Sequence, residues 1–300
     1  MKDALVRAAC ALVRLYFRYV PTKFGKAWLW KHLVKRHLAW RPMELEASIR
    51  LGSRLALRFP EEIQTYLYFF GLWEPVLTRY IESLLQPGDV FIDIGANIGY
   101  YSLLATKLVG SSGIVIAIEA SPSIYQRLLD NIERNAAQVT AHNVAVLDHS
   151  GRIPIFRGPD DHIGRTSAIP SHSGRDRPVI EAEVEGRPLG LIVPPELIAR
   201  ARLIKIDVEG AEWHVVQGMK DLLASLSPRT ELVVEVEADA LRDAGASVEA
   251  FLDIFAQAGF RPYAMANEYS FEPYLKRGSV DLPPLPSAKF GQQDIVFRRG

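Results

Sequence analysis

Apolar residues in the middle of the chain form short runs that alternate with segments of helical periodicity. Five short segments are rich in apolar residues, which is typical of strands buried on both faces of a sheet. They lie at 90–94, 114–118, 139–147, 203–208 and 231–237. The periodicity between them predicts helices at 100–109, 122–135 and 211–224, the second capped by Ser121 with Pro122 in its first turn. Strands that alternate with helices predict a parallel sheet with helices on both faces.

Further elements are expected around this central pattern. In chain order they are a hairpin at 43–59, helices within 61–86, short strands at 152–157 and 179–184, a helix at 247–258, and strands at 260–266 and 294–298. The last two strands bring the predicted sheet to seven. We therefore predict a helical and hairpin extension over residues 1–60 and one α/β domain over residues 61–300.

The residues in the turn after the first of these strands distinguish between possible ligands. Asp93, Gly95, Asn97 and Gly99 follow at alternate positions, which departs from the G-x-G-x-x-G pattern of a dinucleotide site. An acid at the strand end would repel a pyrophosphate but suits the cationic amino group of an amino-acid moiety. Glu119 ends the next strand and is placed to accept hydrogen bonds from ribose hydroxyls. These groups predict an S-adenosylmethionine site, the alternative being a glycine turn that binds no ligand.

Three segments in the same order resemble the motif set of the FkbM-type methyltransferases. They are Asp93-Ile-Gly-Ala-Asn-Ile-Gly99, Lys205-Ile-Asp-Val-Glu-Gly-Ala-Glu-Trp213 and Glu231-Leu-Val-Val-Glu235. The similarity covers about residues 65 to 240. It implies a class I methyltransferase-like fold with a doubly wound, mostly parallel sheet, S-adenosylmethionine as the methyl donor, and transfer to a hydroxyl. The family methylates hydroxyls on sugars, lipids and polyketides alike, so the acceptor stays open.

Acids cluster after the fourth core strand. Asp207 ends that strand, and Glu209 and Glu212 follow within one helical turn. Such a group can supply a general base for the acceptor hydroxyl, or it can bind a divalent metal, although the ligand set is too incomplete to predict one. Acids also stabilise a helix N-terminus, which is the purely structural alternative. We take Asp207, Glu209 and Glu237 as catalytic candidates and Glu212 as a substrate candidate. Family members often have a histidine where Glu237 stands.

Other candidate contacts come from the third strand and from a polar loop. Asn143 and Asp148 bracket the end of that strand, where related folds hold the adenine amino group. The loop over 158–167 offers His162, Arg165 and Ser167 to a sugar or phosphate. A solvated insertion without function is the alternative for this loop.

Charge is distributed unevenly, although the formal net charge of the 300 residues is zero. Residues 1–41 carry ten Lys or Arg and one acid, whereas the remainder carries 25 Lys or Arg and 34 acids. This acidic body opposes nucleic-acid binding. The single cysteine, Cys10, excludes an intramolecular disulfide and fits a reducing compartment such as the cytoplasm.

The basic N-terminus predicts two short amphipathic helices, at about 4–20 and 23–37. Arg7, Arg14 and Arg18 fall within about 40° of one another on the first helix, beside a wide apolar face. Neither helix is apolar over the roughly 20 residues that a span requires, and no secretory signal is expected. The pair could lie on an anionic membrane, or it could form a cap on the catalytic domain or on a second subunit of a homodimer.

Taken together, these features predict an O-methyltransferase that acts on a glycan, lipid-linked glycan or glycolipid at the inner face of the cytoplasmic membrane. Two alternatives stay open. The first is methylation of a soluble natural product, a polyketide or a sugar, with the N-terminus as a lid or dimer contact. The second is a membrane-surface protein that binds the cofactor without catalysis.

Overall fold

The computed structural model describes residues 2–174, 176–267, 270–275 and 280–299. Its centre is a seven-stranded sheet in the order β11-β12-β10-β9-β3-β4-β5. The strands are β3 (Val90–Ile94), β4 (Ile114–Ile118), β5 (Thr140–His142), β9 (Ala201–Ile206), β10 (Glu231–Glu237), β11 (Phe260–Met265) and β12 (Gln292–Arg299). β12 runs antiparallel to its neighbours β10 and β11, while the pairings among β5, β4, β3, β9 and β10 are all parallel. The expected doubly wound, mostly parallel α/β fold is confirmed.

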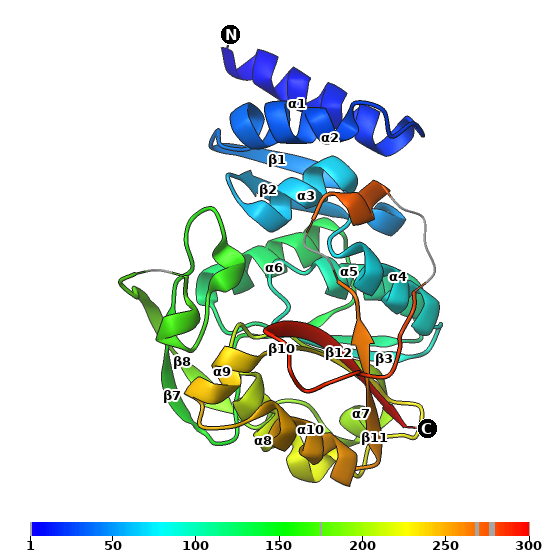
Figure 1. The fold of residues 1–300 in the computed structure, drawn as a ribbon, viewed down its shortest axis with the longest axis vertical. Coiled ribbons are helices and arrows are strands. Elements are labelled where there is room, and N and C mark those ends of the chain that lie inside the picture. The colour runs from blue at the N-terminus through cyan, green and yellow to red at the C-terminus, as the bar shows by residue number, and fades with distance from the viewer. Residues whose placement is uncertain (1, 175, 268–269, 276–279, 300) are drawn as a thin grey trace.

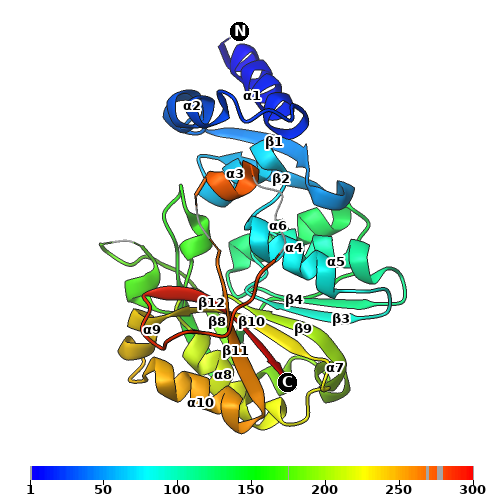
Figure 2. The same cartoon turned by 45° about the vertical axis from the view of Figure 1, so that its right-hand side comes forward.

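Helices cover both faces of this sheet (Figure 2). One face carries α4 (Pro75–Leu84), α5 (Tyr100–Val109) and α6 (Pro122–Arg134), and the other carries α7 (Pro195–Arg200), α8 (Glu212–Leu223) and α10 (Val248–Gln257). A short helix, α9 (Ala238–Asp243), follows β10. Strand alternation assigns the core residues to these two layers: Phe91 packs on the α5 side, whereas Ile92 and Ile94 do not share its cluster and pack on the α8 side.

The run predicted as one strand at 139–147 is divided between two sheets. β5 ends at His142, and β6 (Ala145–Val146) joins a separate three-stranded sheet with β8 (Ile180–Arg187) and β7 (Gly151–Phe156). The Asn143 side-chain amide lies at the break and donates to the carbonyls of Glu119 and Ala120, both at 2.9 Å. Polar residues at 140, 142 and 143 interrupt the apolar positions of this segment, but this local pattern does not show where one strand ends and the next begins.

The N-terminal extension forms a cap at one end of the molecule (Figure 1). It consists of α1 (Lys2–Tyr19), α2 (Lys26–Leu29), the π-type helix η1 (Trp30–Leu38) and the hairpin β1 (Met43–Ser48) with β2 (Arg54–Phe59), which rest on α3 (Glu62–Phe70). Phe17 of α1 stacks on Phe70 with ring centroids 5.2 Å apart. Cys10, Val13 and Phe17 belong to the same hydrophobic cluster as Phe91 of the central sheet. The remaining elements are short 3-10 turns at Arg50–Gly52, Ile163–Arg165, Pro170–His172, Leu189–Leu191 and Glu272–Leu275.

The three arginines of α1 point into the protein rather than away from it. Arg7 donates to the Glu44 carbonyl at 2.8 Å and Arg14 to the Glu46 carbonyl at 3.4 Å. Arg18 donates to the carbonyls of Leu67 and Tyr68 at 2.9 and 2.6 Å, and so satisfies the last turn of α3. Burial lowers the pKa of Arg18 to about 10. This face of α1 therefore has the packing expected of a cap.

In the described part of the chain, no helix has the length and hydrophobicity that crossing a bilayer requires.

Candidate functional site

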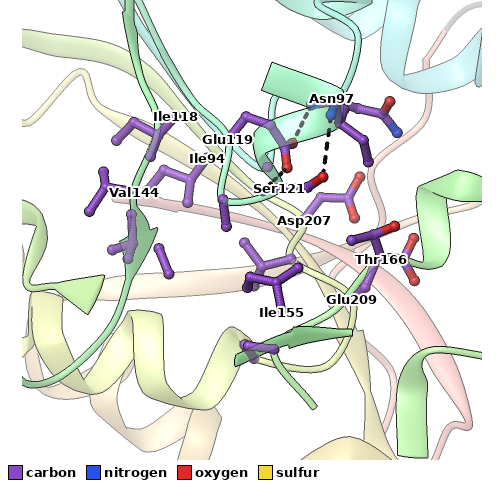
Figure 3. Close-up of a pocket in the computed structure, with 18 of the residues that line it drawn as sticks. Ile94, Asn97, Ile118, Glu119, Ser121, Val144, Ile155, Thr166, Asp207 and Glu209 are labelled. Atoms are coloured by element: carbon purple, nitrogen blue, oxygen red, sulfur yellow. Dashed lines mark hydrogen bonds between the residues drawn. The ribbon is translucent and has the colours of Figure 1, made fainter. Parts of the chain in front are cut away.

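A cavity opens at the carboxyl ends of β3, β4 and β9, where the strand order reverses direction (Figure 3). Ligands of open α/β sheets bind at this edge. The cavity with its mouth encloses about 730 Å³. Its lining combines the turn after β3, the end of β4, the segment 144–147, the loop after β7 and the turn after β9. Segments that are distant in sequence thus meet at the predicted position.

The end of β4 places one carboxylate on the cavity wall. Glu119 is 8% exposed, and its Oε2 accepts from the Asn97 N–H while its Oε1 accepts from the Ser121 N–H, both at 2.9 Å (Figure 3). Burial raises the pKa of Glu119 to about 7, although these two hydrogen bonds act in the opposite direction. Gly95, Asn97 and Glu119, which were predicted to bind the cofactor, therefore share one wall. Ser121 was predicted as a helix cap, which it is, but its contact with Glu119 was not foreseen.

Asp93 lies behind this wall rather than on it. Its side chain is fully buried, and Oδ2 accepts from the Ser102 hydroxyl at 2.6 Å. Oδ1 has no hydrogen-bond partner among the described residues. Burial raises the pKa of Asp93 to about 6. Gly99 immediately precedes α5 with a φ of 91°, and a Cβ there would lie 2.6 Å from Cδ1 of Leu128 on α6. Gly99 is also absent from the cavity lining. Contact of Asp93 and Gly99 with the cofactor stays a prediction.

The two candidates from the third strand occupy different places. Asn143 braces the end of β4 through the bonds described above. Asp148 lies beyond β6 and pairs with the Nδ1 atoms of His149 at 2.5 Å and His214 at 3.3 Å. Neither residue lines the cavity, so their contact with an adenine also stays a prediction.

The apolar part of the cavity comes from several elements. Ile118, Val144 and Ile155 face it from β4, from the turn before β6 and from β7 (Figure 3). Thr166 and Ala168 contribute from the loop after β7. This apolar surface has no local signal in the sequence, because the loop is polar overall and its contribution depends on how it folds back.

A second cavity of about 830 Å³ adjoins the first and is acidic. Its lining residues are Glu62, Ile63, Trp73, Glu74, His162, Arg165, Asp207, Glu209, Glu235, Glu237 and Gln292. Six of these are carboxylic acids, against one arginine and one histidine. Among the described residues, Asp207, Glu209 and Ile63 line both cavities. The junction between the two spaces therefore carries two carboxyl groups.

The two carboxyl groups at this junction differ in how readily they ionise. Burial disfavours the ionised form of Asp207, but the Lys205 ammonium, 2.8 Å from Oδ2, outweighs it and lowers the pKa of Asp207. Lys205 and Asp207 therefore form an ion pair. Burial and the nearby charge of Asp207 hold the pKa of Glu209 well above its ordinary range, and the same causes act on Glu235. The surroundings of the junction therefore favour the ionised form of Asp207 over the ionised forms of its acidic neighbours.

The other predicted catalytic and substrate residues divide into two groups. Glu237, His162 and Arg165 line the second cavity, and Glu237 also pairs with His172 at 3.2 Å. Ser167 and Glu212 do not line it. The Ser167 hydroxyl donates to the Glu209 carbonyl, which holds the turn after β9 in place.

Glu212 supports the same turn from beneath. It is 2% exposed, and its Oε1 accepts from the backbone N–H groups of Val208 and Gly210 at 3.2 and 3.1 Å. These bonds match the structural alternative for an acid at a helix start. A role of Glu212 or Ser167 in substrate binding stays a prediction.

Several residues of the acidic cavity were not predicted from the sequence. Glu62 belongs to α3, Glu74 immediately precedes α4, and Gln292 begins β12. Each lies in an element that the sequence predicts, but nothing local indicates that these three side chains face one space. In the described part of the chain, no three His, Cys, Asp or Glu side chains are arranged to hold a metal ion.

Comparison with known proteins agrees with this geometry. The family described as methyltransferase FkbM domain matches residues 93–262, more than half of the chain. The hexuronic acid methyltransferase AglP of Haloferax volcanii is 25% identical over 197 residues, which are 66% of this chain and 75% of that protein. A shorter match, 37% identical over 51 residues, covers 17% of this chain and 11% of the 23S rRNA (uracil(1939)-C(5))-methyltransferase RlmD of Acinetobacter baumannii.

Solved structures show distant likeness. Precorrin-6y C5,15-methyltransferase from Geobacter metallireducens has a TM-score of 0.40 at 15% identity, over 75% of this chain and 87% of that one. Fibrillarin from Aeropyrum pernix, in complex with S-adenosyl-L-methionine, has a TM-score of 0.40 at 11% identity, over 85% and 82%. TM-scores and identities this low give no information about the substrate. The family match instead spans the turn after β3, the acids after β9 and the end of β10, and the chain therefore belongs to the FkbM family of S-adenosylmethionine-dependent methyltransferases.

Proposed function

We propose that this enzyme methylates a hydroxyl group of a sugar in a glycan, lipid-linked glycan or glycolipid. The observation that carries the proposal is the junction at Asp207 and Glu209, which line both the cofactor cavity and the acidic cavity beside it. A polar second cavity of about 830 Å³ suits a sugar better than a flat apolar ring system. The similarity to a hexuronic acid methyltransferase supports a sugar as the acceptor.

The first cavity has the polar and apolar groups that binding of S-adenosylmethionine requires. Glu119 would accept hydrogen bonds from the ribose hydroxyls, and the close turn at Gly95 and Asn97 would border the same moiety. Ile118 and Val144 would contact the adenine. When bound, S-adenosylmethionine supplies a sulfonium methyl group that moves from sulfur to the acceptor oxygen, leaving S-adenosylhomocysteine.

Asp207 is the proton acceptor in this proposal. Its pairing with Lys205 keeps the carboxylate ionised, and its position on both cavities brings it to the reacting hydroxyl. A proton acceptor must be ionised when the substrate arrives. Burial and neighbouring charge raise the pKa values of Glu209 and Glu235, which favours Asp207 over them for this role. The walls of the junction align the hydroxyl and exclude water.

The charge of the acidic cavity restricts the acceptor further. Six carboxylic acids would repel the carboxylate of a uronic acid, even when some of them are protonated. We therefore expect the acceptor to differ from the hexuronic acid in the name of the Haloferax relative. A neutral or amine-bearing sugar would fit the charge of this cavity.

An assay with radiolabelled S-adenosylmethionine tests both parts. Neutral hexosides, amino-hexosides and hexuronates would be offered free and lipid-linked, with mass spectrometry locating the added methyl group. We expect transfer to oxygen, with kcat/KM for the neutral or amino sugars at least about tenfold above that for the matched hexuronate, since one repelled charge in a partly buried site is worth about 1.4 kcal/mol or more. Transfer to polyketide hydroxyls alone, or cofactor binding without turnover on any sugar, would contradict the proposal.

The raised pKa of Glu119 predicts pH-dependent cofactor affinity. Ribose hydroxyls donate to the ionised carboxylate, so binding weakens as pH falls below the pKa of about 7. By linkage, the Kd for S-adenosylhomocysteine should fall about tenfold between about pH 6 and pH 8. Calorimetric titration across this range measures it.

Glu119→Gln should bind more weakly and lose most of this pH dependence. Glu133→Gln, an exposed change on α6 of the same side-chain type, should leave the profile unchanged. A wild-type Kd that is equal at both ends of the range would remove Glu119 from the ribose site.

A further inference from the structure

The outer face of the cap is apolar and exposed. Leu5, Leu12, Leu15 and Tyr19 of α1 are 67%, 67%, 49% and 74% exposed. They lie at helical spacing on the side opposite Cys10, Val13 and Phe17, which are buried. No residue of this outer face is charged, because the arginines of α1 are turned toward the hairpin and α3. Among the described residues, packing of the cap thus leaves this face of α1 without a partner.

The second helical segment adds exposed aromatic rings and positive charge to the cap. Phe24 and Trp28 are 86% and 63% exposed. Lys23, Lys31 and Arg36 of the same segment are also exposed. Residues 4–43 contain no acid at all. Apolar residues, amphipathic rings and unopposed positive charge are the composition of helices that lie in a membrane interface.

We propose that this surface, formed by Leu5, Leu12, Leu15, Tyr19, Phe24 and Trp28 with Lys23, Lys31 and Arg36, binds the cap to an anionic phospholipid bilayer. Charge favours a bilayer over a second copy of the chain, since an interface between two identical surfaces would bring the same cations together. Anionic headgroups neutralise these cations instead. The arginines of α1 bind backbone carbonyls within the protein and are not part of the proposed membrane surface. In this proposal the bilayer contacts the outer face of the helix instead.

A groove at the edge of the cap shares one lining residue with the acidic cavity. Trp30, Lys35 and Trp40 line this groove together with Glu62, and Glu62 also lines the acidic cavity. Trp40 is 61% exposed. An acceptor held in the bilayer by a lipid could therefore present its sugar to the cavity beside the cap. The bilayer proposal itself rests on the cap alone, so its failure would leave the methyl-transfer proposal untouched.

Co-sedimentation with phosphatidylcholine vesicles, with and without phosphatidylglycerol, tests the proposal on the full chain. We expect binding to the anionic vesicles, weakened by high salt. Leu12→Glu should reduce the partition coefficient at least about tenfold, and Lys31→Glu should reduce it at least about fivefold.

Two matched changes outside the surface serve as controls. Leu191→Glu alters a leucine that is 64% exposed, in the 3-10 turn beside α8, on the sheet face away from the cap. Lys220→Glu reverses an exposed lysine on α8. Both should bind vesicles as the wild type does, and titration with S-adenosylhomocysteine shows that each variant is folded. Wild-type protein that stays in the supernatant, or equal losses in the controls, would overturn the proposal. So would a dimer in light scattering that Leu12→Glu dissociates without any vesicle binding, since that identifies a second copy as the occupant.

Discussion

Asp207→Asn should lower kcat by about 10²- to 10⁴-fold, the range that a positioned proton acceptor contributes, while the Kd for S-adenosylhomocysteine changes only a few-fold. Asparagine preserves the shape of the side chain but cannot take the hydroxyl proton. Asp93 also raises the pKa of Lys205, so Lys205 still has a carboxylate nearby when Asp207 is replaced. The fold should therefore survive. Steady-state kinetics with the best acceptor from the labelling assay, together with calorimetry, measure both quantities.

Glu209→Gln is the informative comparison for this prediction. Glu209 lines the same two cavities, but burial and neighbouring charge raise its pKa, so glutamine resembles the protonated form that its surroundings favour. We expect kcat to stay within about tenfold of the wild-type value, because Asp207 remains as the proton acceptor. Asp253→Asn, an exposed change on α10, controls for the substitution itself. A large loss in Glu209→Gln with a mild effect in Asp207→Asn would reverse the assignment of the proton acceptor.

Gly95→Ala should abolish cofactor binding and lower the free energy of unfolding by about 3 kcal/mol or more, since steric overlap adds to the strain of about 1–2 kcal/mol for a side chain in a left-handed conformation. Gly95 has a φ of +81°, and a Cβ there would lie 1.7 Å from the Asp207 carbonyl oxygen. The turns after β3 and β9 would have to separate. These turns carry Asn97 and Asp207, so the site would open as the fold weakens. Chemical denaturation and titration with S-adenosylhomocysteine measure the two effects.

Gly245→Ala separates the steric effect from the backbone effect. Gly245 also has a positive φ, +75°, but a Cβ there meets no atom within 4 Å. We expect a loss of only about 1–2 kcal/mol, from backbone strain alone, and unchanged cofactor affinity. Equal losses in the two variants would show that contact between the turns does not matter.

The central sheet could be predicted because its signals are local. β3, β4, β9 and β10 each read as short apolar runs, and the Ser121 cap and Pro122 marked the start of α6 correctly. The acid at the end of β9 was likewise placed by its position in the chain. Strands of a parallel sheet end at one edge, so the sequence predicts that Gly95, Glu119 and Asp207 lie near one another, as they do.

Other features depend on packing between distant segments. The pattern over 139–147 predicts one strand and does not show the bend at Asn143. The hydrogen bonds of the Asn143 side chain go to the end of β4 and the residue after it. The helical periodicity of α1 located its arginines on one stripe but not the direction in which the stripe faces. That direction followed from backbone carbonyls of β1 and α3 that the arginines satisfy.

By itself, the sequence determined the order of strands and helices, the family and the edge of the sheet where the ligand binds, because periodicity and turn chemistry act over a few residues. Only the tertiary structure decided which acids share the second cavity and which of them ionises most readily. Folding brings Glu74, Glu209 and Glu235 into the same cavity as Asp207. Lys205 stabilises the negative charge of Asp207, while burial raises the pKa values of Glu209 and Glu235. Charge state depends on desolvation and on neighbours in space, and neither can be read along the chain.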